Sequence, residues 1–546
     1  MTSGFRPAAA MALVSALLAV VLTWPLAAGL ASTGRIDSGD HRHVVWNIGW
    51  VARALTTAPG TLFDANIYYP YRSTLAYSEA NLVAGTLAIP VWLATHNALA
   101  ATNAVILLSF VLSSLAAFAL MRHLTGHLSA SALGAMLFSF SPFVFGRLPH
   151  MQLLMTFGLP LTLLALHRFA ASPRAGRALA LGVALAVTAL SCGYYGIFGG
   201  LVVGWGLLWL GIATGRWREA RFWLWAVAAL AIAAIITAPF LIPYAGTREA
   251  GFARSLDDAR MFSADWRSYL ASPTLSMRWV LPIIGTWQDV LFPGLLACAF
   301  ASLAVVHTLR RSPEPWPRAT VAFYISLVAL ALWASFGPDA GLYRLFFETL
   351  PFFDMIRAPA RFGVVVTLGL SVLAAFAIAR TVDRIPSARR RGAIGVLAVV
   401  AIAAATVGPL RLATRPPMHE VYERLAQMPT GAVAEFPYWV TPVDRHRHTE
   451  YMLASTWHWQ PLINGYSDHL PAEAYTDGLA LATFPAPEAW EVLRRRGARY
   501  VVVHWGLFPP GSSPRARVFE DHVGRELRPI VDHQDASLFE LMKPIE

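Results

Sequence analysis

A series of long uncharged, apolar runs between Pro7 and Leu410 is the feature that most constrains the fold. Hydrophobic residues make up 56% of the 546 residues, charged residues only 14%, and the mean hydropathy is +0.50. Soluble globular domains carry roughly 25% charged residues. A helix that crosses the hydrocarbon core of about 30 Å needs about 20 apolar residues. The sequence therefore predicts a mainly α, polytopic helical membrane protein.

We expect eleven spans. The run 178–215 would reach about 57 Å as one straight helix at 1.5 Å per residue, which is too long for a single crossing. It must fold back as a hairpin, and the two glycines of Cys192-Gly-Tyr-Tyr-Gly196 mark the natural break. The other nine runs are 7–34, 99–121, 123–146, 151–166, 222–247, 290–306, 319–338, 362–379 and 392–410.

The orientation depends on the short run 80–95, which Pro90 interrupts. If it does not cross, every arginine-rich loop lies on the amino-terminal side, as the positive-inside rule requires. We therefore expect a re-entrant or surface segment there, a cytoplasmic amino terminus in a bacterial inner membrane, and a periplasmic carboxy-terminal part. The loop arginines are Arg168, Arg174, Arg177, Arg216, Arg218, Arg221, Arg310, Arg311, Arg318, Arg380, Arg384, Arg389, Arg390 and Arg391.

Composition changes after Thr414 toward proline, charge and β-branched residues. We predict a transmembrane domain over 1–414, with a first external loop over 35–97 that carries surface helices, and a periplasmic α+β domain over 415–546. The expected strands and helix are 431–436, 500–504, 537–541 and 486–496.

Several functions are not supported. The net charge of +11 comes from arginines in short loops, so it orients the chain in the membrane and does not indicate nucleic acid as a partner. The two cysteines, Cys192 and Cys298, lie in apolar runs without neighbours at metal-ligand spacing. No nucleotide-binding or zinc-protease motif is present. We predict no cofactor, and no pattern supports a divalent metal.

The first loop opens with the segment from Arg35 to His43, which places Asp37 and Asp40 at a membrane surface. The run behind it repeats apolar residues at helical spacing, with Trp46 and Trp50 one turn apart, and predicts a helix that lies in the interface. Asp40 could act as a general base. It or a neighbouring residue could instead only cap the helix. We favour catalysis, with Asp37 as the second candidate.

Further along the loop, Phe63 to Tyr71 contains Asp64, Asn66 and Tyr68. These residues could contact a substrate, or the first two could make a local turn while the tyrosines sit at headgroup level. Glu79 is another candidate carboxylate.

Two other loops are expected on the same face. His150 could assist acid and base catalysis, although a lone histidine at a helix start is more often structural. Arg357 and Arg361 stand where the positive-inside rule disfavours arginine, which indicates an anionic ligand such as a lipid phosphate, with snorkelling to headgroups as the alternative.

In the carboxy-terminal part, His458, Asn464 and Tyr466 lie in segments that combine aromatic rings with polar groups. Carbohydrate sites have this composition, and so do ordinary aromatic cores.

The layout resembles the GT-C superfamily of integral membrane glycosyltransferases, which includes protein O-mannosyltransferases and aminoarabinose transferases. Ser38-Gly-Asp40, Trp46 to Trp50, Phe63 to Pro70, Arg357-Ala-Pro-Ala-Arg361 and Asn464-Gly-Tyr466 are similar to a group of uncharacterised bacterial GT-C-like proteins. The resemblance implies that Asp40 is the catalytic aspartate and that Arg357 and Arg361 hold a lipid phosphate. Many GT-C enzymes carry an acid in the second external loop, where this chain has His150.

The resemblance therefore implies an inverting glycosyltransferase that moves a sugar from a polyprenyl-phosphate donor to a hydroxyl of an envelope glycan, lipid or protein. A transporter or flippase of a lipid-linked glycan is one alternative, although the predicted spans hold few ionisable residues. A non-catalytic scaffold that binds glycan is the other.

Overall fold

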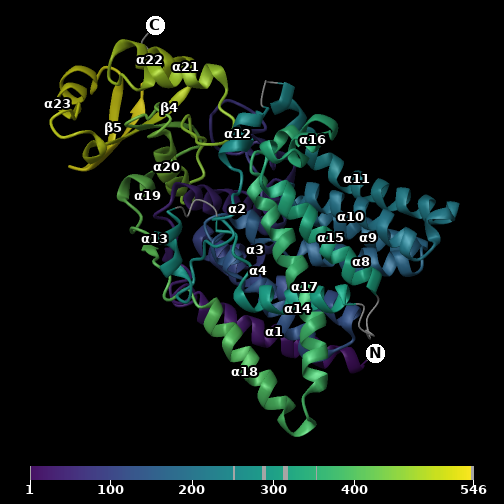
Figure 1. Ribbon diagram of the computed structural model, residues 1–546. Helices are drawn as coiled ribbons and strands as arrows, with labels where there is room; N and C mark the ends of the chain where they lie inside the picture. The colour runs from purple at the N-terminus through teal and green to yellow at the C-terminus, as the bar shows by residue number, and fades with distance from the viewer. Residues whose placement is uncertain (1, 250–252, 286–289, 311–317, 352, 543–546) are drawn as a thin grey trace. The chain divides into compact units, whose positions relative to one another are not determined.

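The computed structural model describes residues 2–249, 253–285, 290–310, 318–351 and 353–542 (Figure 1). Arg311, one of the predicted loop arginines, lies outside them. The chain forms two compact units. The helical unit comprises Met1–Ala28, Ala104–Ile242 and Ala253–Arg411, and the mixed unit comprises Gly29–Asn103, Pro243–Phe252 and Leu412–Glu546. The first loop thus belongs to the same unit as the carboxy-terminal segment, and the domain boundary at residue 414 stays a prediction.

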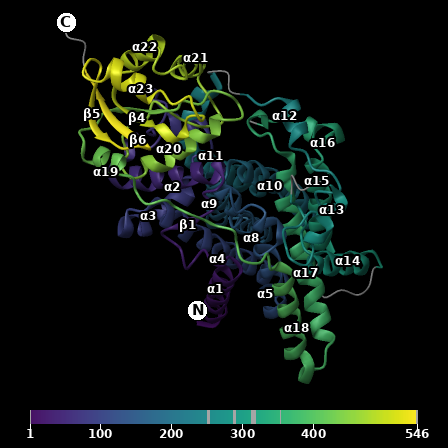
Figure 2. The ribbon, with the colours of Figure 1, turned by 90° about the vertical axis from the view of Figure 1, so that its left-hand side faces the viewer.

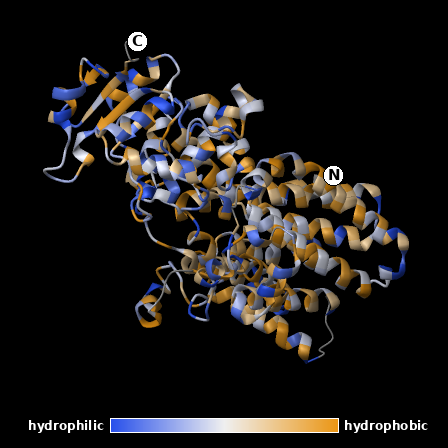
Figure 3. Ribbon diagram, turned by 90° about the horizontal axis from the view of Figure 1, so that it is seen from above, coloured by the Kyte–Doolittle hydropathy of each residue, from blue (hydrophilic) through white to orange (hydrophobic). Residues whose placement is uncertain are grey.

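Helices make up the helical unit, and hydrophobic residues, orange in Figure 3, run along them. Within the described residues, eight helices of the chain are long and apolar enough to cross a membrane, and three shorter apolar helices accompany them. The chain is a multi-pass membrane protein. The helices of this unit, two of which extend past its boundaries, are α1 (Thr2–Leu22), α4 (Ala98–Thr125), α5 (Leu128–Ser139), α6 (Pro142–Phe145), α7 (Met151–Leu154), α8 (Gly158–Ala171), α9 (Ala175–Ser191), α10 (Gly193–Ala213), α11 (Ala220–Glu249), α12 (Leu256–Met261), α13 (Leu281–Ile284), α14 (Leu295–Leu309), α15 (Arg318–Ser335), α16 (Leu342–Thr349), α17 (Gly363–Arg384) and α18 (Ser387–Ala405).

The predicted hairpin is confirmed. Cys192 ends α9 and begins α10, and the two helices pack against each other (Figure 1). The first run differs from the prediction, because α1 ends at Leu22 and turns occupy residues 23–32. A proline at position 25 cannot donate the backbone hydrogen bond that a continuing helix needs.

Helix α17 is the most buried of the long apolar helices and packs against α5, α14 and α15. Small residues allow this close packing. A β-carbon on Gly369 would lie 2.5 Å from the Cγ2 atom of Val328 on α15, so only glycine fits at this crossing.

The mixed unit combines helices with a four-stranded sheet of order β3-β4-β6-β5 (Figure 2). Strands β3 and β4 are parallel, and the other two pairs are antiparallel. Three of these strands and α22 match the sequence predictions, while β5 was not predicted. The elements are β1 (Thr33–Gly34), α2 (Gly39–Thr57), α3 (Leu82–Thr95), β2 (Ala413–Thr414), α19 (Glu420–Gln427), β3 (Ala432–Phe436), α20 (His448–Ser455), α21 (Ala472–Leu481), α22 (Pro487–Arg495), β4 (Ala498–His504), α23 (Arg515–Arg517), β5 (Leu527–Asp532) and β6 (Ala536–Leu541).

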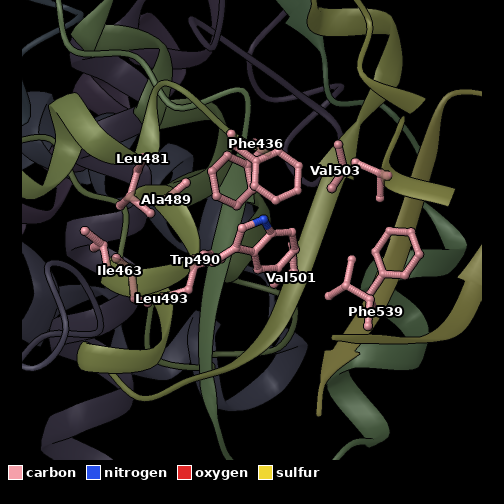
Figure 4. Close-up of a cluster of buried hydrophobic side chains, with 14 of the residues drawn as sticks. Phe436, Ile463, Leu481, Ala489, Trp490, Leu493, Val501, Val503 and Phe539 are labelled. Carbon is pink, nitrogen blue, oxygen red and sulfur yellow. The ribbon is translucent and has the colours of Figure 1, made fainter. Parts of the chain in front are cut away.

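One hydrophobic cluster fixes the sheet. Figure 4 shows Trp490 of α22 between Phe436 of β3 and Val501 of β4, with Phe539 of β6 nearby. Trp490 is 2% exposed, and its indole NH donates a hydrogen bond of 2.9 Å to the Pro485 carbonyl. The short pair β1 and β2 joins Thr33 to Thr414 in the same unit. This pairing holds the start of the first loop against the start of the carboxy-terminal segment.

Candidate active site

Helix α2 holds the first loop through its two tryptophans. The indole NH of Trp46 donates to the Oδ1 atom of Asn66 at 2.8 Å, and that of Trp50 donates to the Leu62 carbonyl at 2.8 Å. Trp46 is 1% and Trp50 6% exposed. The loop covers both rings and satisfies their polar NH groups, and the interfacial placement of the helix stays a prediction.

The side chains of Asn66 and Asp64 shape the loop. The amide nitrogen of Asn66 donates to the Gln460 carbonyl at 3.0 Å, so Asn66 connects α2 with the carboxy-terminal segment. The carboxylate of Asp64 accepts from the backbone NH of Ser73 at 2.8 Å and pairs with Arg72 at 2.9 Å. These contacts favour the structural reading of both residues, and their role as substrate ligands stays a prediction.

Two motifs far apart in the sequence form a backbone ladder. The NH of Tyr68 donates to the Asn464 carbonyl at 3.1 Å, the NH of Tyr69 to the Leu462 carbonyl at 2.8 Å, and the NH of Leu462 to the Asn66 carbonyl at 2.9 Å. The first loop thereby adds to the segment that pairs with strand β3 through Val433. Both motifs belong to the predicted site, and the fold of the mixed unit brings them together.

Tyr68 lies at the centre of this ladder. Its φ of +55° is in the left-handed region, and its side chain is 2% exposed. Gly465 allows this placement, because a β-carbon there would lie 2.8 Å from three ring carbons of Tyr68. Among the described residues, the Tyr68 hydroxyl has no hydrogen-bond partner, and burial raises its pKa well above the usual value.

Asp40 stands exposed in the first turn of α2. The N-cap residue Ser38 makes no side-chain cap bond, whereas Asp40 lies in the first turn, where the helix dipole favours a carboxylate. The capping alternative therefore stays open for Asp40. One turn on, burial lowers the pKa of His43, while the charges of Asp468 and Asp40 act in the opposite direction. His43 also meets the ring of Tyr466 edge-on, with centroids 6.4 Å apart. Two carboxylates therefore act electrostatically on one imidazole, which the ring of Tyr466 also contacts.

Sequence reasoning missed Asp468. Its carboxylate accepts a hydrogen bond of 3.1 Å from the Ser78 hydroxyl, beside the predicted Glu79. The Glu79 carboxylate in turn lies within electrostatic range of the Tyr244 hydroxyl, which donates to the Ser78 carbonyl at 3.1 Å. Asp37, by contrast, pairs with Arg35 at 3.3 Å and keeps 52% of its side chain exposed.

Two predicted carboxy-terminal ligands have structural partners. Asn464 accepts from the NH of Glu435 at 2.8 Å and donates to its carbonyl at 2.9 Å. His458 stacks on Tyr422 with centroids 5.8 Å apart, accepts from the Gln460 NH at 3.0 Å, and has its pKa lowered to about 3 by burial. These contacts support the aromatic-core reading of this segment.

In the helical unit, the predicted arginines surround the hairpin break. The backbone NH of Arg357 donates to the Tyr194 hydroxyl at 2.9 Å, and its guanidinium lies 5.0 Å from the centroid of the Phe262 ring. The guanidinium of Arg361 lies 4.1 Å from the centroid of the Tyr194 ring. Asp258 is within electrostatic range of Arg357.

A third guanidinium belongs to this arginine cluster. Arg147, 8% exposed, packs over the Phe143 ring at 5.1 Å, and both Arg147 and Arg361 act electrostatically on the Tyr195 hydroxyl. That hydroxyl donates to the Leu153 carbonyl at 2.7 Å. His150 is the N-cap residue of α7, where its side chain makes no cap bond.

The model of a protein family described as "Domain of unknown function (DUF6311)" matches residues 11–406. The chain belongs to this family. No curated protein matches this DUF6311 protein.

Three solved structures of similar fold are glycosyltransferases of the GT-C type. The oligosaccharyltransferase of Archaeoglobus fulgidus in the apo form is 14% identical, with a TM-score of 0.52 over 92% of this chain and 70% of that one. The same archaeal enzyme, AglB, in complex with an inhibitory peptide and a dolichol-phosphate, is 15% identical, with a TM-score of 0.50 over the same shares. The arabinofuranosyltransferase AftD from Mycobacteria is 16% identical, with a TM-score of 0.58 over 99% of this chain and 42% of AftD. The GT-C resemblance is confirmed for the fold of this DUF6311 protein.

Within the part of the DUF6311 chain that the structure describes, no three His, Cys, Asp or Glu side chains are grouped so that they could hold a metal ion. The residues around His43 supply two carboxylates and one imidazole. That set suits proton transfer.

Proposed function

We propose that this DUF6311 protein is a membrane glycosyltransferase that moves a sugar from a polyprenyl-phosphate donor to an acceptor hydroxyl. The observation that carries the proposal is the exposed Asp40 carboxylate at the start of α2, beside a histidine that Asp468 also influences. A carboxylate at an aqueous surface with a second acid nearby is suited to accepting a proton.

The reaction is inverting. Asp40 accepts the proton of the acceptor hydroxyl while that oxygen attacks the anomeric carbon of the sugar. The bond between the anomeric carbon and the phosphate oxygen breaks, and the polyprenyl phosphate leaves with the bonding electron pair. His43 acts as a positioning residue, because it interacts with Asp40 from the next turn of the same helix.

We also propose that the arginine cluster of the helical unit, Arg147, Arg357 and Arg361, binds the phosphate of the lipid donor. Guanidinium groups match phosphate oxygens in charge and geometry, and stabilisation of developing charge is commonly the largest catalytic contribution. The archaeal AglB structure holds a dolichol-phosphate, which supports a lipid phosphate as the ligand class. Asp258 partly balances the charge near Arg357.

The acceptor is a hydroxyl of an envelope glycan, lipid or protein, and the reaction takes place on the periplasmic face of the bacterial inner membrane. The predicted cytoplasmic amino terminus and the arginine-rich loops support this orientation. A nucleotide-sugar is not needed, because the lipid phosphate already activates the sugar.

The test is sugar transfer by the purified full-length protein in liposomes, with radiolabelled decaprenyl-phosphate arabinofuranose and undecaprenyl-phosphate mannose as donors. Asp40→Asn should lower turnover about 100-fold to 10,000-fold, whereas Asp37→Asn, which removes an exposed and ion-paired carboxylate in the same segment, should leave it nearly unchanged. Equal turnover by the parent and Asp40→Asn would refute the assignment. Movement of labelled donor across the bilayer without sugar release would favour transport instead.

A further inference from the structure

A groove with a volume of about 540 Å³ lies between the neighbouring helices α8 and α9 of the helical unit. It is distinct from the arginine cluster at the break between α9 and α10, because none of its lining residues belongs to that cluster. The residues that line it are Leu161, Leu164, Ala165, Arg168, Arg174, Arg177, Ala180, Val183, Ala184 and Val187.

The lining follows one face of each helix. On α8 the spacing from Leu161 to Arg168 places the residues on one side of two turns, and on α9 the residues from Arg177 to Val187 do the same. At 1.5 Å per residue the two faces run for about 10 and 15 Å. Alanines 165, 180 and 184 leave the space that larger side chains would fill.

All three charged residues of the groove lie at one end. Arg168 is in the last turn of α8, Arg174 is the N-cap residue of α9, and Arg177 is in its first turn. This end is the connection between the two helices, whereas the other seven lining residues are apolar. The groove is therefore apolar along the membrane-spanning parts of α8 and α9 and cationic at the connection between these two helices.

Little nearby negative charge balances these arginines. Arg177 donates to the carbonyls of Arg168 and Ser172, which closes the end of α8. No carboxylate lines the groove, and within the described residues no ion pair of Arg168, Arg174 or Arg177 is found. Arg168 and Arg174 are both exposed.

We propose that this groove is a binding site for an anionic phospholipid. The phosphate headgroup lies at Arg168 and Arg174, and an acyl chain lies along Leu161, Leu164 and Val187 of the groove. Apolar surface favours the acyl chain, guanidinium groups favour the phosphate, and basic pockets between membrane helices on the cytoplasmic side bind anionic headgroups. A soluble anion would gain nothing from the apolar length. The site does not depend on the proposed glycosyl transfer.

The experiment measures lipid binding to the full-length protein in detergent by native mass spectrometry, with dioleoylphosphatidylglycerol and dioleoylphosphatidylcholine as probes. We expect the anionic lipid to bind about tenfold or more tightly to the parent. Arg168→Gln with Arg174→Gln should weaken its binding about 10-fold to 30-fold. The control pair, Arg389→Gln with Arg391→Gln, removes two exposed arginines from the start of α18 and should leave binding unchanged.

Two further measurements test whether the groove binds a whole lipid or only its phosphate, and whether binding needs the shape of the groove as well as its charge. Ala180→Trp fills the groove from an exposed position while all arginines remain, and it should also abolish preferential binding. Inorganic phosphate should not compete. Equal binding of both lipids, equal loss in the control pair, unchanged binding in Ala180→Trp, or displacement by inorganic phosphate would each overturn the proposal. Thermal unfolding identifies any variant that fails to fold.

Discussion

The guanidinium of Arg361 lies 4.1 Å from the centroid of the Tyr194 ring, directly at the break between two membrane helices. The hydroxyl of the same tyrosine accepts the backbone NH of Arg357 at 2.9 Å. One aromatic side chain thus positions both arginines of the Arg357-Ala-Pro-Ala-Arg361 motif. That side chain, Tyr194, lies in the glycine-flanked break between α9 and α10. The sequence predicted this break only because the apolar run 178–215 is too long for one crossing.

Arg361→Gln should raise the KM for the lipid-phosphate donor about 10-fold to 100-fold, because a charge-assisted hydrogen bond is worth about 1.5–3 kcal/mol. Steady-state kinetics over a range of donor concentrations measures this effect. Arg344→Gln, which removes an exposed arginine paired with Glu348, is the matched control. An unchanged KM in Arg361→Gln would show that Arg361 does not bind the donor.

Asp468→Asn should lower kcat about tenfold and move the pH profile. The Asp468 charge raises the pKa of His43, so its removal lowers that pKa further, and the limb of the pH–rate profile that reports His43 shifts to lower pH. Glu473→Gln, at an exposed carboxylate in the same segment, should shift nothing. A lower rate with an unmoved profile would indicate that Asp468 is only structural.

Asn66→Ala should destabilise the mixed unit by about 1–3 kcal/mol, because it leaves the buried Trp46 indole NH without its partner. Thermal unfolding in detergent, followed by tryptophan fluorescence, gives the change. Gln427→Ala removes an exposed amide that accepts a hydrogen bond from Arg424 and should leave the unfolding temperature within the experimental error. A stable Asn66→Ala protein would show that water or another group replaces the amide.

Gly465→Ala should cost about 1–3 kcal/mol, because the new methyl group would lie 2.8 Å from ring carbons of Tyr68. Gly506→Ala is the control, since a β-carbon there meets nothing within 4 Å. If the contact with Tyr68 causes the loss, Tyr68→Ala in the Gly465→Ala background should add less destabilisation than Tyr68→Ala alone. Additive losses would contradict the contact.

Stability should rise with pH between about 4 and 6.5. Burial lowers the pKa of His448 to about 4, while its ring nitrogens contact the Trp439 carbonyl at 2.8 Å and the Asn464 amide at 3.3 Å. The unfolded chain therefore binds a proton that the folded chain excludes, and about 3 kcal/mol present above pH 6.5 is lost as the pH falls to about 4. Unfolding temperatures of the parent, His448→Gln and the exposed control His446→Gln over this pH range test the sign. A pH dependence equal in His448→Gln and the parent would exclude His448 as its source.

The sequence predicted the features that local physics decides. Each of the eleven predicted apolar runs contains helix, although α1 ends at Leu22, well before the end of its run. The break at Cys192 follows from length and from glycine. The strands around Val433 and Val501 follow from their β-branched residues. The resemblance, in contrast, supplied the GT-C fold that the solved structures confirm.

The contacts of the candidate site could not be predicted in this way. Asn66 donates to the Gln460 carbonyl across a sequence separation of 394 residues. A local pattern of apolar residues cannot predict a partner so distant in the sequence. Asp468 is an unremarkable acid in the sequence, and only the folded mixed unit brings it near His43. Composition also cannot tell lipid from a covering loop, so the burial of Trp46 and Trp50 under the first loop was not predicted.

The ladder between the first loop and the segment around Asn464 also has a consequence for how the protein is made. Translation proceeds at about 5–20 residues per second, so a separation of 394 residues means that Asn66 waits about 20–80 s for its partner to be synthesised. During that interval the loop with Asp40 has left the ribosome without the segment around Asn464 that bonds it. The nascent chain should therefore be inactive and protease-sensitive until its last quarter is synthesised, which couples the onset of activity to completed synthesis.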